Sequence, residues 1–343
     1  LLVRYSGHEA VEHILPPIIN GSISMIIGLT LAGSALSDAA PVALAKDTAA
    51  TVFNTSWVWV VSLITLFSTI LYTRYLKGFL GQLPLLLGAA TGCIAAGLLY
   101  AIGGPSMSLF RAMPAEALAA SPFRLGIFAV PAFSFPLPSA AAVLAIMPIA
   151  IATIPESTAH IYQIDIYVND LAKKKGSSKK YDLASMLDKN LIGDGLCDMI
   201  SGVVGGPAGT NYGENISTMA ITRVFSIPVL IVASFIAMII SFFTPLIQAI
   251  YGIPKAVIGG LEVYLFGAIA AQGIAIMIEK KVDMFDSKNI AVIASVMVIG
   301  IGGQYAFNGN IPFFGLQVPC IAGAAIFGIL LNLILSLGDK KKA

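Results

Sequence analysis

Residues 193–223 read GDGLCDMISGVVGGPAGTNYGENISTMAITR, and the prediction of the fold starts from them. An apolar stretch breaks there into a run of Gly, Pro and Asn residues and restarts on an acid, Glu214. In hydrocarbon, no water satisfies free backbone N–H and C=O groups, so irregular backbone at membrane depth must be packed in protein or line a polar cavity. The break is therefore a candidate binding site if its surroundings are membrane.

The composition places the rest of the chain in a membrane. The 343 residues are 57% hydrophobic and only 11% charged, whereas soluble domains carry roughly 25% charged residues. Apolar runs of about 20 residues match the thickness of a bilayer core. Together with two shorter pieces that flank the break, near 190–205 and 214–224, they predict about ten or eleven spans. The long runs lie near 16–37, 56–73, 79–103, 138–163, 225–251, 256–279, 289–307 and 313–337.

Lysine clusters predict which side of the membrane each loop faces. Three clusters are separated by even numbers of expected spans, and the positive-inside rule then puts all three in the cytoplasm. We expect a multi-pass protein of the cytoplasmic membrane, with the loop 173–180 and the C-terminus cytoplasmic and residues 164–188 as the longest polar connection. The clusters are Lys173, Lys174, Lys175, Lys179 and Lys180; Lys280, Lys281 and Lys288; and Lys340, Lys341 and Lys342.

Several function classes find no support in the sequence. The three cysteines are scattered through apolar segments and form neither a metal pattern nor a disulfide framework. The chain shows no nucleophile, base and oxyanion set, no phosphate-binding glycine motif and no nucleic-acid module. We therefore expect no enzyme, no metal site and no nucleic-acid partner.

Glu156 and His160 occur in the sequence PESTAH, four residues apart and thus on one helix face. Three interpretations compete. A metal site is incomplete with two ligands, and a pair that satisfies itself is a purely structural alternative. The third, a carboxylate in a cavity with a proton-exchanging imidazole one turn away, is favoured because an acid inside a span is costly and usually marks an ion or substrate path.

Glu214 follows the glycine-rich break and is expected at the N-terminus of a half-helix. Free backbone N–H groups and the positive end of the helix dipole gather at such a terminus, and transporters with broken helices use this geometry near the bilayer midplane. A simple helix cap is the structural alternative. An acid beside free N–H groups offers both acceptors and donors, which suits a planar ligand such as a nucleobase.

These motifs resemble the nucleobase/ascorbate transporter (nucleobase:cation symporter) family, and within it the bacterial uracil permeases. The resemblance covers the whole chain and is carried by GDG with a following ISG, by TNYGENISTMAITR and by PESTAH. Weaker support comes from LPPIINGSISMIIGLTLAG and from IGG at 258–260.

The resemblance implies an all-α polytopic membrane protein, an inverted-repeat transporter with broken half-helices and fourteen segments. The run 16–37 resembles the fourth segment, so the chain is expected to lack about three N-terminal segments. The implied core domain comprises residues 1–40 and 148–252, and the gate domain comprises 41–147 and 253–343, which includes a cytoplasmic tail.

The resemblance also implies roles for individual residues. Glu156, Tyr212, Gly213 and Glu214 match the positions that bind the base, and His160, together with Glu156, matches the proton-coupling position. The other matching positions of the signature are Asn215, a further candidate for the site, Thr222 and Arg223.

Three positions depart from the family pattern. Ser217 stands where the family usually has Gly, and Glu262 and Phe266 stand where we associate Ser and Tyr with the uracil permeases. Glu262 is thus a third acid and a further candidate for the site. Glu262 is either a proton relay in the gate domain or a residue on a solvated face of its helix.

The predicted function is proton-coupled import of uracil or a related pyrimidine base by alternating access, with the proton as coupling ion and no other cofactor. The expected partners are the small-molecule nucleobase and the lipid bilayer, with a homodimer as a further candidate. A xanthine or urate (purine) permease of the same family is the nearest alternative. An anion transporter of similar fold is a more distant one, because a half-helix N-terminus also attracts anions.

Overall fold

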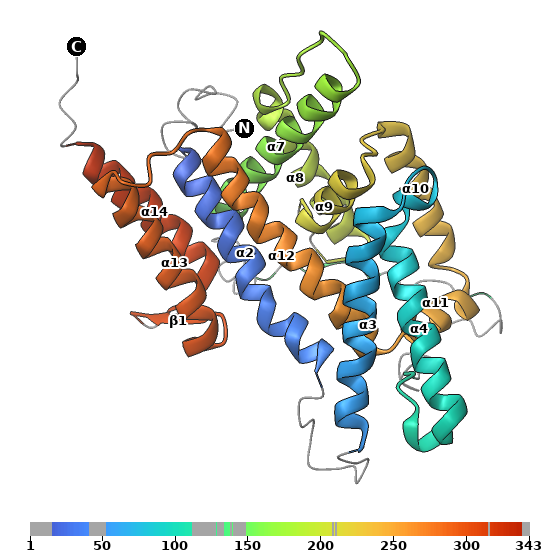
Figure 1. Cartoon of the computed structure of the whole chain (residues 1–343). Coiled ribbons are helices and arrows are strands. Elements are labelled where there is room, and N and C mark those ends of the chain that lie inside the picture. The colour runs from blue at the N-terminus through green and yellow to red at the C-terminus, as the bar shows by residue number, and fades with distance from the viewer. Residues whose placement is uncertain are drawn as a thin grey trace. The chain divides into compact units, whose positions relative to one another are not determined.

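The computed structural model describes residues 16–40, 53–111, 128, 134–137, 139, 149–207, 209, 211–314 and 316–337 (Figure 1). Within these ranges the fold is helical, as predicted, with one short β-hairpin. Its helices are α2 (Pro17–Ala39), α3 (Phe53–Tyr75), α4 (Pro84–Gly103), α7 (Ile149–Lys174), α8 (Leu187–Val203), α9 (Gly213–Thr222), α10 (Ile227–Ile240), α11 (Thr244–Tyr251), α12 (Lys255–Glu279), α13 (Ser287–Phe307) and α14 (Cys320–Ser336). Three 3-10 turns, η1 (Leu80–Gln82), η2 (Gly104–Met107) and η3 (Ala184–Met186), and two strands, β1 (Asn310–Phe313) and β2 (Leu316–Pro319), complete the described elements.

The helices confirm a multi-pass membrane protein. Within the described ranges, five helices are long and apolar enough to cross a bilayer, namely α2, α3, α4, α12 and α13. Helices α10 and α14 are apolar but shorter. The beginning of the expected span 138–163, up to residue 148, lies outside the described residues except for position 139.

The predicted break is present. Helix α8 ends at Val203 and α9 begins at Gly213, with irregular backbone in the described positions between them. Helix α9 has only 10 residues, which corresponds to about 15 Å, or half of a bilayer core. Glu214 is the second residue of this half-helix, as expected.

The prediction of a polar loop from residue 164 onward is wrong, because α7 continues to Lys174. The helix ends where Gly176 adopts a left-handed conformation (φ 71°) and Ser177 N donates to Ala172 O at 3.0 Å, the pattern of a glycine C-cap. The segment that follows the helix is hydrogen-bonded to the last turns of α7. Asp165 Oδ1 accepts from Leu183 N at 2.7 Å, and the side chain of Asn169 donates to Tyr181 O and accepts from Tyr181 N, each at 2.9 Å. Polar side chains thus stabilise helix where composition suggested a solvated loop.

Two other expected spans are subdivided. The run 225–251 forms α10 and α11, and Pro245, near the start of α11, lacks the N–H that a continuous helix would need. The run 313–337 begins with the antiparallel hairpin of β1 and β2, in which Asn310 pairs with Pro319 and Phe313 with Leu316. Helix α13 ends on a left-handed Asn308, which turns the chain into this hairpin.

The chain forms two compact units. The first comprises Leu1–Leu31, Phe135–Ser217 and Phe266–Ala343, and the second comprises Ala32–Ser134 and Thr218–Leu265. The division into core and gate domains implied by the family resemblance stays a prediction.

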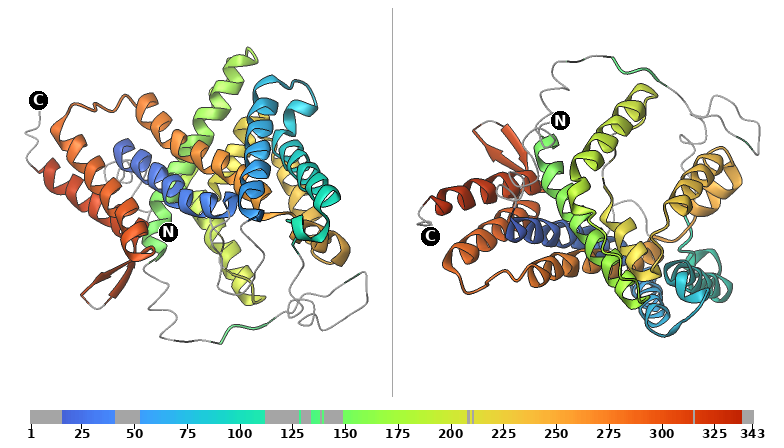
Figure 2. Two further views of the ribbon diagram at one scale, coloured as in Figure 1. Left: turned by 60° about the horizontal axis from the view of Figure 1, so that its bottom comes forward. Right: turned by 90° about the horizontal axis from the view of Figure 1, so that it is seen from above.

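Close helix packing characterises the first unit. A Cβ added to Gly28 of α2 would lie 2.5 Å from Phe266 O and 2.6 Å from Ala270 N of α12, so the two backbones approach as only small residues permit. Helices α13 and α14 form an antiparallel pair with the hairpin at one end (Figure 2). At the other end of this pair, Lys288 Nζ donates to Ser336 Oγ at 2.8 Å.

Helices α3 and α4 of the second unit pack through small residues in the same way. Gly88 and Gly92 of α4 lie directly against the side chains of Thr69 and Thr65 of α3. Both threonine hydroxyls donate back to carbonyls of their own helix, Thr65 to Val61 O at 2.9 Å and Thr69 to Thr65 O at 2.7 Å. The contact is therefore tight without leaving buried hydroxyl donors unpaired.

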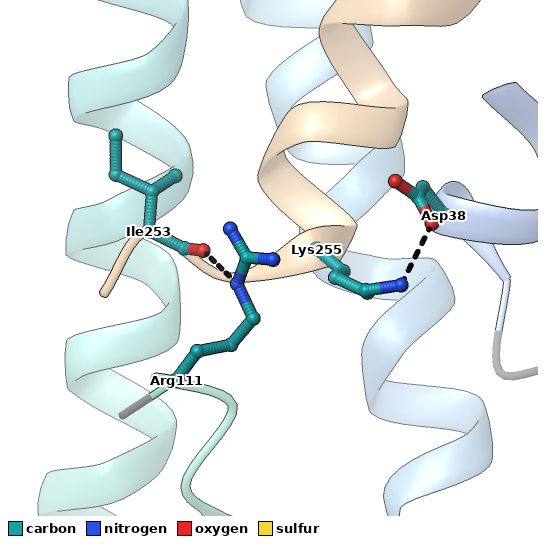
Figure 3. Close-up of polar contacts among 4 residues, drawn as sticks. All are labelled: Asp38, Arg111, Ile253 and Lys255. Carbon is teal, nitrogen blue, oxygen red and sulfur yellow. Dashed lines mark hydrogen bonds and ion pairs between the residues drawn. The ribbon is translucent and has the colours of Figure 1, made fainter. Parts of the chain in front are cut away.

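Two polar contacts fix the start of α12 in the second unit (Figure 3). Arg111 Nε donates to Ile253 O at 2.9 Å, and its guanidinium lies 5.1 Å from the centre of the Tyr251 ring. Two residues later, Lys255 Nζ forms an ion pair of 3.3 Å with Asp38 Oδ1 at the end of α2. The turn between α11 and α12 is thus held from both sides.

Candidate nucleobase site at the helix break

The broken segment is joined to α7 by a hydrogen bond between side chains. Asn211 Nδ2, two residues before α9, donates to Ser157 Oγ of α7 at 2.8 Å. Ser157 is fully buried, so this bond lies inside the protein. It sets the position of the chain just before the half-helix begins.

His160 lies against the first residue of α9. A Cβ added to Gly213 would be 3.0 Å from His160 Nε2 and 3.4 Å from Ile269 Cδ1 of α12. The absence of a side chain at Gly213 therefore lets the imidazole approach the N-terminus of the half-helix. Helices α7, α9 and α12 meet at this point, and all three residues belong to the first unit.

The His160 side chain is only 2% exposed. Neither ring nitrogen makes a well-formed hydrogen bond within the described residues, although the backbone of Asn211 lies close to the ring. Buried polar atoms without partners are rare in native proteins, and they usually mark a place for a ligand, a water molecule or a proton. The imidazole is thus available to exchange a proton or to bind a polar group.

The N-terminus of α9 supplies hydrogen-bond donors beside this imidazole. The first backbone N–H groups of a helix have no partners within it, and the helix dipole adds partial positive charge there. Here these groups begin at Gly213, which is itself buried. The arrangement can bind carbonyl oxygens of a small planar ligand next to a titratable ring.

The structure places the other predicted site residues as follows. Glu156 lies in α7, one turn before His160, and Glu214 lies in the first turn of α9, but both side chains, and that of Ser217, lie outside the described part of the structure. Tyr212 is 55% exposed and Asn215 is also exposed. The described contacts thus join His160 and Gly213, while the roles of the two glutamates stay predictions.

Comparison with known sequences decides the family. The model Xan_ur_permease, described as "Permease family", matches residues 1–309. The chain belongs to this permease family. Membership confirms the resemblance to the nucleobase/ascorbate transporters, and it identifies the chain as a transporter.

Individual relatives of this permease extend the comparison. The uracil permease of Bacillus caldolyticus is 34% identical over 337 residues, which cover 98% of this chain and 71% of the relative. The uracil permease of Bacillus subtilis is 32% identical over 350 residues, covering 100% of this chain and 73% of the relative. The putative pyrimidine permease RutG of Escherichia coli is 31% identical over 337 residues, covering 98% and 68%.

Glu262, the third acid among the candidate site residues, is in the second unit. It lies on α12 at half-buried depth, and its Oε2 atom is buried without a hydrogen-bond partner among the described residues. The charges that act on it are those of the Asp38 and Lys255 pair shown in Figure 3. At least one oxygen of the Glu262 carboxylate is therefore shielded from solvent. Its two expected roles, a proton relay or a residue on a solvated helix face, both stay predictions.

The sequence analysis did not single out Ser157 and Asn211, the two residues whose hydrogen bond joins α7 to the broken segment at the candidate site. Both stand within the quoted motifs, Ser157 in PESTAH and Asn211 in TNYGEN. Small polar residues inside otherwise apolar segments are a weak signal, because most of them bond to their own helix. Only the contact between them shows that these two hold separate segments together.

Proposed function

We propose that the chain is a proton-coupled symporter that carries uracil or a related pyrimidine base across the cytoplasmic membrane by alternating access. The observation that carries the proposal is the buried His160 imidazole beside Gly213, at the N-terminus of a half-helix. The printed names of the relatives, uracil permease and pyrimidine permease, support the substrate class.

The site offers each group of a pyrimidine base a partner. Backbone N–H groups at the start of α9 donate to a ring carbonyl, and we assign the acceptor roles for the ring N–H groups to Glu156 and Glu214. His160 exchanges the coupling proton. Binding and protonation support each other, because an acid inside an apolar span is costly when it is ionised.

Uptake of labelled uracil into cells that lack their own nucleobase permeases tests this proposal. An inward proton gradient is expected to drive accumulation, an uncoupler to abolish it, and unlabelled pyrimidine bases to compete. Competition by xanthine or urate in place of uracil would identify a purine permease instead. An anion-dependent current without nucleobase flux would contradict the proposal altogether.

We also infer that the basic end of α7 faces the cytoplasm. Lys173 and Lys174 end the helix and Lys175 follows it, and all three are exposed. Positive loops favour the cytoplasmic side. In intact cells, a cysteine placed at the exposed Ser178 should resist a membrane-impermeant thiol reagent and should react once the membrane is opened. Labelling in intact cells would show that this end of α7 faces the outside of the cell.

A further inference from the structure

A stripe of polar side chains continues along α7 from His160 toward the lysine-bearing end. Gln163 and Tyr167 follow His160 at spacings of three and seven residues, so the three lie on one face over about 10 Å of helix. Gln163 is 2% exposed and Tyr167 is half-buried. The proposed function uses only the first of the three.

A hydrogen bond to α2 holds the amide side chain of Gln163 in one orientation. Its Nε2 donates to Ser24 Oγ of α2 at 2.7 Å, and Ser24 is fully buried. Its Oε1 is buried without a hydrogen-bond partner among the described residues. Because Ser24 occupies the amide nitrogen, the oxygen is left for another donor, and buried acceptors of this kind commonly bind an ordered water.

Tyr167 continues the stripe on the far side of Gln163. Its hydroxyl lies close to the side chain of Gln272 of α12, which is 5% exposed. Beyond Tyr167, the next polar residues of α7 are increasingly open, and Asp170 and the lysines from Lys173 onward are exposed. The helix is thus buried at His160 and Gln163 and exposed at the lysines that end it.

We propose that Gln163 and Tyr167 line the path by which the coupling proton leaves His160 toward the lysine-bearing end of α7. The inference rests on the proposed function, since it presupposes that His160 carries the proton. All of the residues concerned belong to the first unit. If that end is cytoplasmic, the path leads in the direction in which a proton-driven importer must release its proton.

The step moves one proton and no electrons. An N–H bond of the His160 imidazolium breaks, an O–H bond forms on a water held by Gln163 Oε1, and neutral imidazole remains. That water passes a proton on to water beside the Tyr167 hydroxyl and so to the open end of the helix. Gln163 positions the water and is not itself protonated.

Few charged groups surround this path in the described structure. Lys280 directly follows α12, and its Nζ lies 4.9 Å from the ring centre of Tyr162, the neighbour of Gln163. Asp165 is engaged by the backbone of Leu183. Glu156 precedes His160 by four residues in α7, and Glu214 follows Gly213 at the start of α9. Beyond His160, the path is lined by the neutral side chains of Gln163 and Tyr167, which can pass a proton on without retaining it.

Two transport modes of the full-length protein in proteoliposomes test the path. Net uracil uptake driven by a proton gradient requires proton release at every cycle, whereas exchange of labelled for unlabelled uracil does not. Gln163→Leu is expected to slow net uptake about tenfold, the effect of losing one hydrogen bond from the path, with exchange and uracil binding unchanged. Tyr167→Phe and Ser24→Ala are expected to slow net uptake less, by roughly threefold each.

Matched substitutions separate this effect from general damage. Tyr72→Phe removes a tyrosine hydroxyl that bonds to Thr91 in the second unit, and Gln317→Leu changes an exposed glutamine of β2; both should leave the ratio of net uptake to exchange unchanged. An equal loss of exchange and net uptake in the Gln163, Tyr167 and Ser24 variants, or no loss in any of them, would overturn the path. If the unaltered protein takes up uracil without any response to the proton gradient, the proposed coupling itself fails.

Discussion

Glu156→Gln and Glu214→Gln are each expected to lower proton-driven uracil uptake by about 100-fold, with the protein still present in the membrane. Each substitution replaces a charged acceptor of a ring N–H group by a neutral amide. Hydrogen bonds to charged groups contribute up to about 3 kcal/mol, and each 1.4 kcal/mol corresponds to a factor of ten. The measurement is initial uptake of labelled uracil, normalised to the amount of protein in the membrane.

Glu279→Gln is the matched control for both variants. Glu279 is the last residue of α12 and is exposed, so its loss should leave uptake close to that of the unaltered chain. Normal proton-dependent uptake by either site variant would remove that glutamate from the binding site. Uptake that survives but no longer responds to pH would assign the residue to coupling and not to substrate binding.

Gly213→Ala is expected to weaken uracil binding and uptake by roughly 10- to 100-fold, because small misplacements of groups in a site can have effects of this size. The new methyl group would lie 3.0 Å from His160 Nε2 and 3.4 Å from Ile269 Cδ1. Either the imidazole or the N-terminus of α9 must then move by a few tenths of an ångström. Equilibrium binding of labelled uracil to the purified protein measures the effect.

Gly302→Ala provides the control for this added methyl group. Gly302 is helical and lies in the first unit, and a Cβ at this position meets nothing within 4 Å. The control should bind uracil normally. If Gly213→Ala also binds normally and remains as stable as the control, the contact between α7 and α9 does not form the binding site.

The fold follows from the sequence wherever an apolar run is long and is bounded by Gly, Pro or charged residues. The break before Gly213 was predicted because Gly and Pro are abundant there and the flanking pieces are too short to span a bilayer. The hairpin of β1 and β2 was not predicted. Its strands of four residues lie in an apolar run, and periodicity over so short a run does not distinguish a strand from a helix.

The extension of α7 escaped prediction for a different reason. Residues 164–174 are polar enough to read as a loop, but Asp165 and Asn169 bind backbone groups of Leu183 and Tyr181, 18 and 12 residues away. Contacts between positions so far apart do not appear in any local pattern. They exist only once the chain has turned at Gly176.

The sequence by itself determined a multi-pass membrane protein with a broken segment and the residue types beside the break, because hydrocarbon excludes unpaired backbone and isolated charges regardless of the details of packing. Its resemblance to a transporter family added the function. Only the tertiary structure decided which residues meet. Asn211 reaches Ser157 across 54 residues of chain, and His160 lies against Gly213. Gln163 is oriented by Ser24 so that its oxygen has no partner among the described residues. These contacts depend on the exact approach of separate helices, and that approach is set by side-chain volumes along their whole length.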